Sequence, residues 1–117
     1  MPGHPSVQAD DRLRDLDVGA WRGTAMAEVD VTAWLTDPAF DGHGGESIVS
    51  LLDRVSGWLD QVAAQGGSTV AVTHPAVVRA AVLRAVSAPP HAFWRIDVAP
   101  LSVTHLHWRG AWTLRLT

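Results

Sequence analysis

The sequence predicts an α/β domain with a small mixed sheet, because helix and strand patterns alternate along one short chain. A stripe of apolar residues with helical spacing spans 47–64. A β-branched run at 69–73 follows, and a second helical stretch begins directly after it. Two strand-like segments then flank a turn near the C-terminus. We expect the 117 residues to form a single domain, 1–117.

Composition excludes several classes of protein. Hydrophobic residues make up 47% of the chain and charged residues 18%, which is typical of a globular protein. The net charge is −3 and the pI about 6.0, so no basic surface for nucleic acid or an anionic membrane is expected. Cysteine is absent, which excludes disulfides and thiolate chemistry. No stretch has the pattern of a signal peptide or a membrane span, so we expect a cytoplasmic location.

The N-terminal part is expected to be mostly loop. Residues 1–10 have the pattern of an extended lead-in, and 11–23 that of a loop with at most one helical turn. Apolar residues on one helical face predict a helix over 24–36, which ends before Pro38. The glycine-rich segment 40–47 is expected to be a loop.

The central part carries the clearest signals. The helix predicted over 47–64 is followed by Gly66 and Gly67, which favour its end there. Three successive apolar residues within 69–73 are typical of a strand buried on both faces. A second helix is expected from Pro75 to about Val86.

The C-terminal part predicts a short helical turn over 91–96 and then a β-hairpin. Arg109 and Gly110 are expected to form a two-residue turn, which places His105 and His107 on the same face as Trp112. We therefore expect the histidines to pack against Trp112. An alternating histidine pair can bind a metal, but no third ligand is evident, so no metal site is predicted.

His74 stands between the predicted strand and the helix that follows. Ligands of open α/β sheets bind beyond the carboxyl ends of the strands. The free N–H groups of the helix, from about Ala76, favour an anion at the same place. His74 is therefore a candidate acid, base, nucleophile or donor to an anion. Its position fits equally well a histidine that only bonds a loop carbonyl.

Other candidates are weaker by position alone. Glu46 precedes the long helix, where a carboxylate usually only offsets the helix dipole. His43, in the same loop, is a candidate to line a substrate site. Trp94 either flanks a pocket or closes the core.

Four segments resemble the histidine phosphatase superfamily, the phosphoglycerate-mutase-like phosphohydrolases. They are RLRDLDVGAWRG, GGES with LLDRVSGWL, VAVTHPAVVRAAVL and FWRIDVAPLSVTHL, in that order. The resemblance covers about residues 11–116 and implies a three-layer α/β/α fold. It also implies that one histidine attacks a phosphoryl group, that a second histidine and arginines hold its oxygens, and that a carboxylic acid protonates the leaving group. His74 matches the second histidine and Glu46 the acid. Arg12 and Trp21 match a loop that shapes the substrate mouth.

The family's nucleophile motif, Arg-His-Gly, does not occur in these 117 residues, because no histidine follows an arginine. The chain is therefore similar to the C-terminal half, or somewhat more, of a family member, and a truncated fold is expected. Pro75 also replaces a residue that is often glycine in the family, which removes one backbone donor from the phosphate site.

Three interpretations follow. In the first, His74 and Glu46 act as an acid–base pair on a small molecule, as in an isomerase, cyclase or dehydratase. In the second, the chain is a truncated or split phosphatase that needs an N-terminal part. In the third, it is a non-catalytic binding or scaffold remnant. No cofactor is expected in any of them.

The family resemblance also implies a partner. In the family, the strand before the second histidine pairs with the strand that carries the nucleophile. Residues 70–72 would then lie on an open edge, without the lysine or proline that deters pairing. We expect a homodimer, or a partner that covers this edge.

Overall fold

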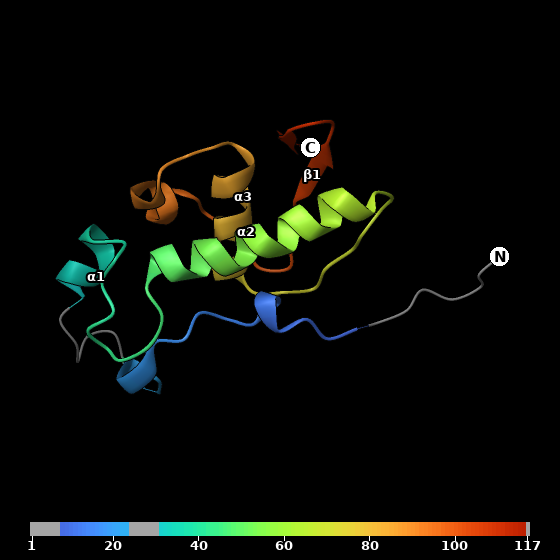
Figure 1. The fold of residues 1–117 in the computed structure, drawn as a ribbon. Helices are drawn as coiled ribbons and strands as arrows, with labels where there is room; N and C mark the ends of the chain where they lie inside the picture. The colour runs from blue at the N-terminus through green and yellow to red at the C-terminus, as the bar shows by residue number, and fades with distance from the viewer. Residues whose placement is uncertain (1–7, 24–30, 117) are drawn as a thin grey trace.

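The computed structural model describes residues 8–23 and 31–116, and it combines helices with a small sheet in an α/β fold, as predicted (Figure 1). The elements, in chain order, are η1 (Asp11–Leu13), η2 (Gly19–Trp21), α1 (Thr32–Thr36), α2 (Ile48–Gln65), α3 (Pro75–Ala85), η4 (Pro90–Arg95), β1 (His105–Trp108) and β2 (Trp112–Arg115). The η elements are 3-10 helices. No helix in the described ranges is long and apolar enough to cross a membrane.

Local sequence signals set the ends of α2 and α3. The Ser47 side chain caps α2 by accepting a hydrogen bond from the N–H of Ser50 at 3.0 Å. Gly66 ends α2 with a φ of 71°, which a glycine adopts without strain. Pro75 occupies the first turn of α3, where its missing N–H leaves no bond unmade. Both predicted helices are confirmed.

Helix α1 is shorter than the helix predicted over 24–36. It spans Thr32–Thr36, and Asp37 caps its end just before Pro38, as expected. The first part of the prediction, 24–30, lies outside the described residues. The short turn predicted over 91–96 is present as η4.

The core lies where α2, α3 and η4 meet. Helix α2 contributes one apolar stripe, α3 a second, and Phe93 of η4 closes the end between them. The buried residues of this core cluster are Trp34, Ile48, Leu51, Val55, Leu59, Val77, Ala80, Leu83 and Phe93. Burial of a side chain the size of leucine contributes about 1.5–3 kcal/mol, so this cluster supplies the main driving force for folding.

The predicted strand over 69–73 is not formed. Among the described residues the segment pairs with no strand, and the side chains of Val70 and Val72 are 93% and 96% exposed. A β-branched run favours an extended backbone, but a strand also needs a neighbour to supply its hydrogen bonds. The prediction of a strand buried on both faces is therefore wrong, and the mixed sheet reduces to two antiparallel strands, β1 and β2.

The hairpin forms with a different turn from the one predicted. Trp108 is paired with Trp112, so the loop has three residues, 109–111, and Gly110 takes a φ of 79°. A shift of one residue moves every side chain to the opposite face. Trp112 therefore packs against Trp108, with ring centroids 5.3 Å apart and the ring planes tilted by 57°. The expected packing of His105 and His107 against Trp112 is wrong, because these histidines pair with Arg115 and Thr113 on the exposed face.

We predict that Leu51→Ala lowers the free energy of unfolding by about 2–5 kcal/mol, because Leu51 is fully buried in the core cluster. Leu116→Ala is the matched control, since Leu116 is 85% exposed, and it should change stability by less than about 0.5 kcal/mol. Urea denaturation of both variants measures the difference. Equal losses in the two variants would show that the core is placed wrongly.

Candidate functional site

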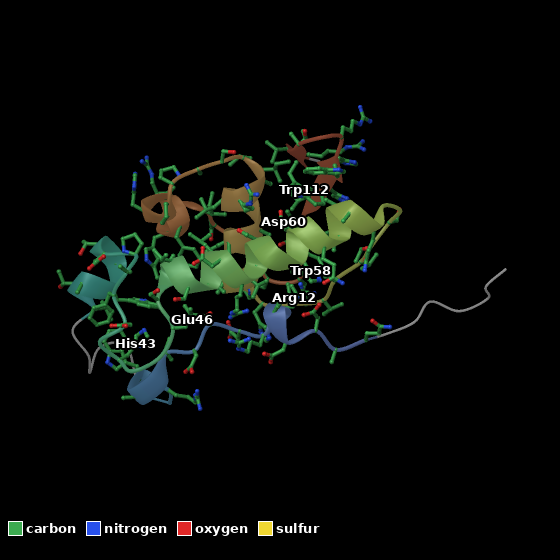
Figure 2. All side chains as sticks on the ribbon, viewed as in Figure 1. Arg12, His43, Glu46, Trp58, Asp60 and Trp112 are labelled. Carbon is green, nitrogen blue, oxygen red and sulfur yellow. The ribbon has the colours of Figure 1, made fainter. Side chains whose placement is uncertain are left out.

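Two loops cross at the start of α2 and fix the backbone of Glu46. The N–H of Glu46 donates to the carbonyl of Asp17 at 2.7 Å, and the N–H of Ala20 donates to the carbonyl of His43 at 2.7 Å. Glycine allows the contact, because a Cβ on Gly45 would lie 2.2 Å from the carbonyl oxygen of Asp17. The glycines of the GGES segment therefore place Glu46 at the N-terminal end of α2 (Figure 2).

Arg54 holds the Glu46 side chain. The Nε and Nη2 groups of Arg54 donate to the two carboxylate oxygens at 2.6 and 2.9 Å. Nη1 also donates to the carbonyl of Arg12 at 2.7 Å, and Nη2 to the carbonyl of Asp15 at 3.0 Å. Only about a tenth of either charged side chain is exposed. This bidentate geometry gives the strongest kind of ion pair, and it engages both oxygens of Glu46.

His74 lies at the start of α3, where its own backbone is extended and caps the helix. Half of its side chain is exposed, and Nδ1 is 3.8 Å from a carboxylate oxygen of Asp15. Ala76 follows in the first turn, whose N–H groups have no acceptor within the helix. A phosphate or carboxylate at this position could accept bonds from both the imidazole and the backbone.

Asp15 and Arg54 connect the two main candidates. The carboxylate of Asp15 faces His74, while its carbonyl accepts from Arg54, which in turn holds Glu46. Within the described ranges no hydrogen bond joins His74 directly to Glu46. The expected joint acid–base role of the two side chains stays a prediction.

His43 lies in the interior and not at an open site. Its side chain is only 2% exposed, and the rings of Trp21, Trp34 and Phe40 surround it at centroid distances of 5.1, 4.9 and 5.5 Å. Nδ1 accepts a hydrogen bond from the N–H of Gly45 at 2.9 Å, which fixes the loop before Glu46. His43 therefore does not line an open cavity here, contrary to expectation, because the aromatic rings cover it. Trp21 belongs to the same aromatic cluster.

Arg12 points away from Glu46. Its guanidinium pairs with Asp10 at 2.9 Å and also donates to Gln61 of α2, two helical turns beyond Arg54. This pairing lowers the pKa of the Asp10 carboxyl and raises the pKa of Arg12. The structure thus places Arg12 on the flank of α2, and only its carbonyl reaches Arg54.

Trp94 lies at the edge of the aromatic residues. Its ring contacts Phe93 and Trp34 at centroid distances of 4.9 and 5.7 Å, and the guanidinium of Arg79 lies 5.8 Å from it. Part of the ring remains exposed. Trp94 thus closes the core on one side, and the structure does not bring it to Glu46.

Sequence reasoning missed Arg54 and Asp15. One signal was available for Arg54, because an arginine beside Leu51 and Val55 sits at the border of the buried stripe of α2, where a charge needs a partner. No comparable signal marked Asp15, which lies in an irregular loop. The described residues contain no group of three or more side chains that could hold a metal ion.

A family model and two proteins named as phosphatases match this chain. The model of the histidine phosphatase superfamily (branch 1) matches residues 3–116. Phosphoserine phosphatase 1 of Hydrogenobacter thermophilus is 31% identical over 121 residues, which cover 94% of this chain and 57% of that protein. Glucosyl-3-phosphoglycerate phosphatase of Mycolicibacterium vanbaalenii is 41% identical over 58 residues, 44% of this chain and 25% of that protein.

A solved structure has a similar fold. The structure titled mycobacterial hydrolase 2 superposes with a TM-score of 0.77 at 26% identity, over 92% of this chain and 57% of its own. The chain therefore spans less than two thirds of the length of each of these relatives.

We predict that Arg54→Met destabilises the protein by about 3–5 kcal/mol, because it leaves the carboxylate of Glu46 buried without a partner. The double variant Arg54→Met/Glu46→Gln should recover part of this loss. Arg84→Met is the control, since its pair with Asp60 is exposed and contributes at most about 1 kcal/mol. Chemical denaturation compares the variants. A loss for Arg54→Met no larger than the control's would refute the buried pair.

We also predict a pH-dependent contribution from Asp17. The N–H of Gly19, then Arg22 and His43, lower the pKa of its carboxyl. A lowered pKa stabilises the fold above the unfolded-state pKa of about 3.9, and this stability is lost as pH falls through the folded-state pKa. Asp17→Asn should therefore be less stable than wild type near pH 7, and the gap should narrow as the pH falls below the unfolded-state pKa. Urea midpoints at pH 7 and across this acidic range test this, and a constant gap would exclude the mechanism.

Proposed function

The chain belongs to the histidine phosphatase superfamily, and we propose that it supplies the phosphate-binding and leaving-group side of a phosphomonoester hydrolase. The nucleophile in this proposal comes from polypeptide outside these 117 residues, since none of the six histidines follows an arginine. The observation that carries the proposal is the half-exposed His74 at the start of α3, joined through Asp15 and Arg54 to Glu46. Both curated relatives are named as phosphatases.

Each residue has a defined task in this proposal. His74 and the first-turn N–H groups of α3 donate hydrogen bonds to phosphoryl oxygens as charge develops on them. Glu46, in its acid form, delivers a proton to the oxygen of the departing alcohol. For this step a carboxyl oxygen must leave Arg54, whose guanidinium then stays beside the site. Asp15 acts on His74 and orients its ring.

A second candidate is the acid–base pair of His74 and Glu46 acting on a small molecule without phosphate, as an isomerase, cyclase or dehydratase. The absence of an Arg-His dipeptide favours it. The contacts favour it less, because Arg54 engages both oxygens of Glu46 and no hydrogen bond between described residues joins the pair. For either reaction we propose a small-molecule substrate and a cytoplasmic location, from the composition of the chain.

The proposal predicts that the 117-residue chain alone hydrolyses no p-nitrophenyl phosphate and forms no acid-labile phosphoenzyme. A fusion should do both when it carries, ahead of residue 1, the part of the Hydrogenobacter phosphatase that lies outside the match. In this fusion His74→Ala and Glu46→Gln should each lower turnover by about 10²–10⁴, the usual size of an acid–base contribution. His91→Ala, at an exposed position of η4, is the control.

Two results would contradict this. A phosphoenzyme trapped on the chain alone would show that the nucleophile lies within it. A folded fusion without activity, whose His74→Ala variant equals the parent in every assay, would favour a non-catalytic binding role.

A further inference from the structure

The β1–β2 hairpin carries a net positive charge, opposite in sign to the rest of the chain (Figure 1). Residues 105–115 contain two arginines and two histidines but no aspartate or glutamate. With the histidines neutral this segment has a charge of +2, and because the whole chain has −3, the other 106 residues carry −5. Charge segregated in this way gives one part of the surface an attraction for anions that the net charge conceals.

The strand register gathers the basic side chains of the hairpin on one face. His105 pairs with Arg115 and His107 with Thr113, and residues directly opposite each other point to the same side of a sheet. All four are exposed. Leu106, which points to the other side, packs against the core cluster. The basic side chains therefore face away from the helices.

Arg109 extends this face beyond the last strand pair. It lies in the turn and lines a hollow of about 320 Å³ together with His107, Thr113 and Arg115. We call these side chains and that of His105 the basic face.

The guanidinium groups of the basic face have no acidic partner among the described residues. Five arginines elsewhere in the described ranges form an ion pair with a carboxylate, whereas Arg109 and Arg115 form none. A guanidinium has five N–H donors in a fixed plane that matches a carboxylate. Two unpaired guanidiniums beside two imidazoles therefore offer several donors to an anionic ligand.

We propose that the basic face binds an extended acidic segment of a partner polypeptide, with carboxylates at every second residue. Side chains on one face of a strand recur at intervals of about 6.8 Å, and so do the alternate side chains of an extended peptide. His105 with Arg115 forms one level, His107 forms the next, and Arg109 continues the series at the turn. The arginines bind carboxylates in bidentate geometry at the two ends, and His107 donates one hydrogen bond between them.

Charge and side-chain chemistry disfavour two other occupants. A nucleic acid gains affinity from aromatic rings on which its bases stack, but Trp108 and Trp112 lie on the opposite face of the hairpin. The charge of −5 on the rest of the chain also repels a long polyanion. A second copy would have to use carboxylates that are already engaged, because Asp15 faces His74 and Asp17 pairs with Arg22.

The test measures binding of a fluorescein-labelled peptide, Thr-Glu-Thr-Glu-Thr-Glu-Thr, to the 117-residue chain by fluorescence anisotropy. Low salt is used, because it screens surface charges least. We expect this peptide to bind at least tenfold more tightly than a peptide of the same composition whose three glutamates are adjacent. The double variant Arg109→Gln/Arg115→Gln should weaken its binding at least tenfold. Circular dichroism of this variant should match the parent, since both arginines are exposed.

Arg84→Gln/Arg95→Gln is the matched control, because it removes the same charge from two exposed arginines outside the hairpin. It should leave the affinity within twofold of the parent. Equal losses in the two double variants would show an effect of net charge alone and overturn the proposal. Equal affinity for the two peptides would overturn it as well, since the spacing would then play no part.

Three further measurements distinguish the occupants. Tighter binding of a single-stranded oligonucleotide with three phosphates would assign the basic face to nucleic acid and overturn the proposal. Self-association that Arg109→Gln/Arg115→Gln abolishes would assign it to a second copy, with the same consequence. Peptide binding should persist in the fusion described above, and its loss there would show that other polypeptide covers the face, which also overturns the proposal. Binding is read without turnover, so the result is independent of the proposed function.

Discussion

Arg54 organises the candidate site, because its guanidinium donates to four oxygens that belong to three residues. Two belong to the Glu46 carboxylate, and the others are the carbonyls of Arg12 and Asp15. The N-terminal loop has only short 3-10 turns of its own, so contacts of this kind attach it to α2. The carboxylate of Asp15, whose carbonyl Arg54 holds, lies 3.8 Å from Nδ1 of His74. One side chain of α2 therefore holds Glu46 and also the loop residue whose carboxylate faces His74.

The helices could be predicted because their signals are local. Ser47, Gly66 and Pro75 act through their own backbone or that of residues a few positions away, so their effects can be inferred from short stretches of sequence. The segment 69–73 could not, since a β-branched run becomes a strand only if another chain segment supplies the ladder. The predicted length of the hairpin turn was wrong by one residue for a related reason. Both two- and three-residue loops fit Arg109-Gly110-Ala111, and packing of Trp108 on Trp112 accompanies the longer one.

Within the site, the resemblance supplied roles for His74 and Glu46, and the structure adds what each one contacts. The case of His43 shows that position in the sequence alone does not tell whether a side chain faces an open site. A histidine in a glycine-rich loop beside a carboxylate suggests a site residue, but the loop folds back so that three aromatic rings enclose it. Within this enclosure its Nδ1 accepts a hydrogen bond from the N–H of Gly45. Long-range contacts such as that of Arg54 with the carbonyl of Asp15 involve no particular side chain on the accepting residue, so the sequence carries no mark of them.

The two main residues of the site, Glu46 and His74, differ in how far they are exposed to solvent. Glu46 is enclosed and fully paired, whereas His74 is half exposed and follows a segment whose two valines face solvent. Exposure of these two valines, in a segment without backbone hydrogen bonds to other described residues, is unfavourable unless other polypeptide covers them. Glu46 is therefore held by contacts within the described residues, whereas those residues leave the surroundings of His74 open.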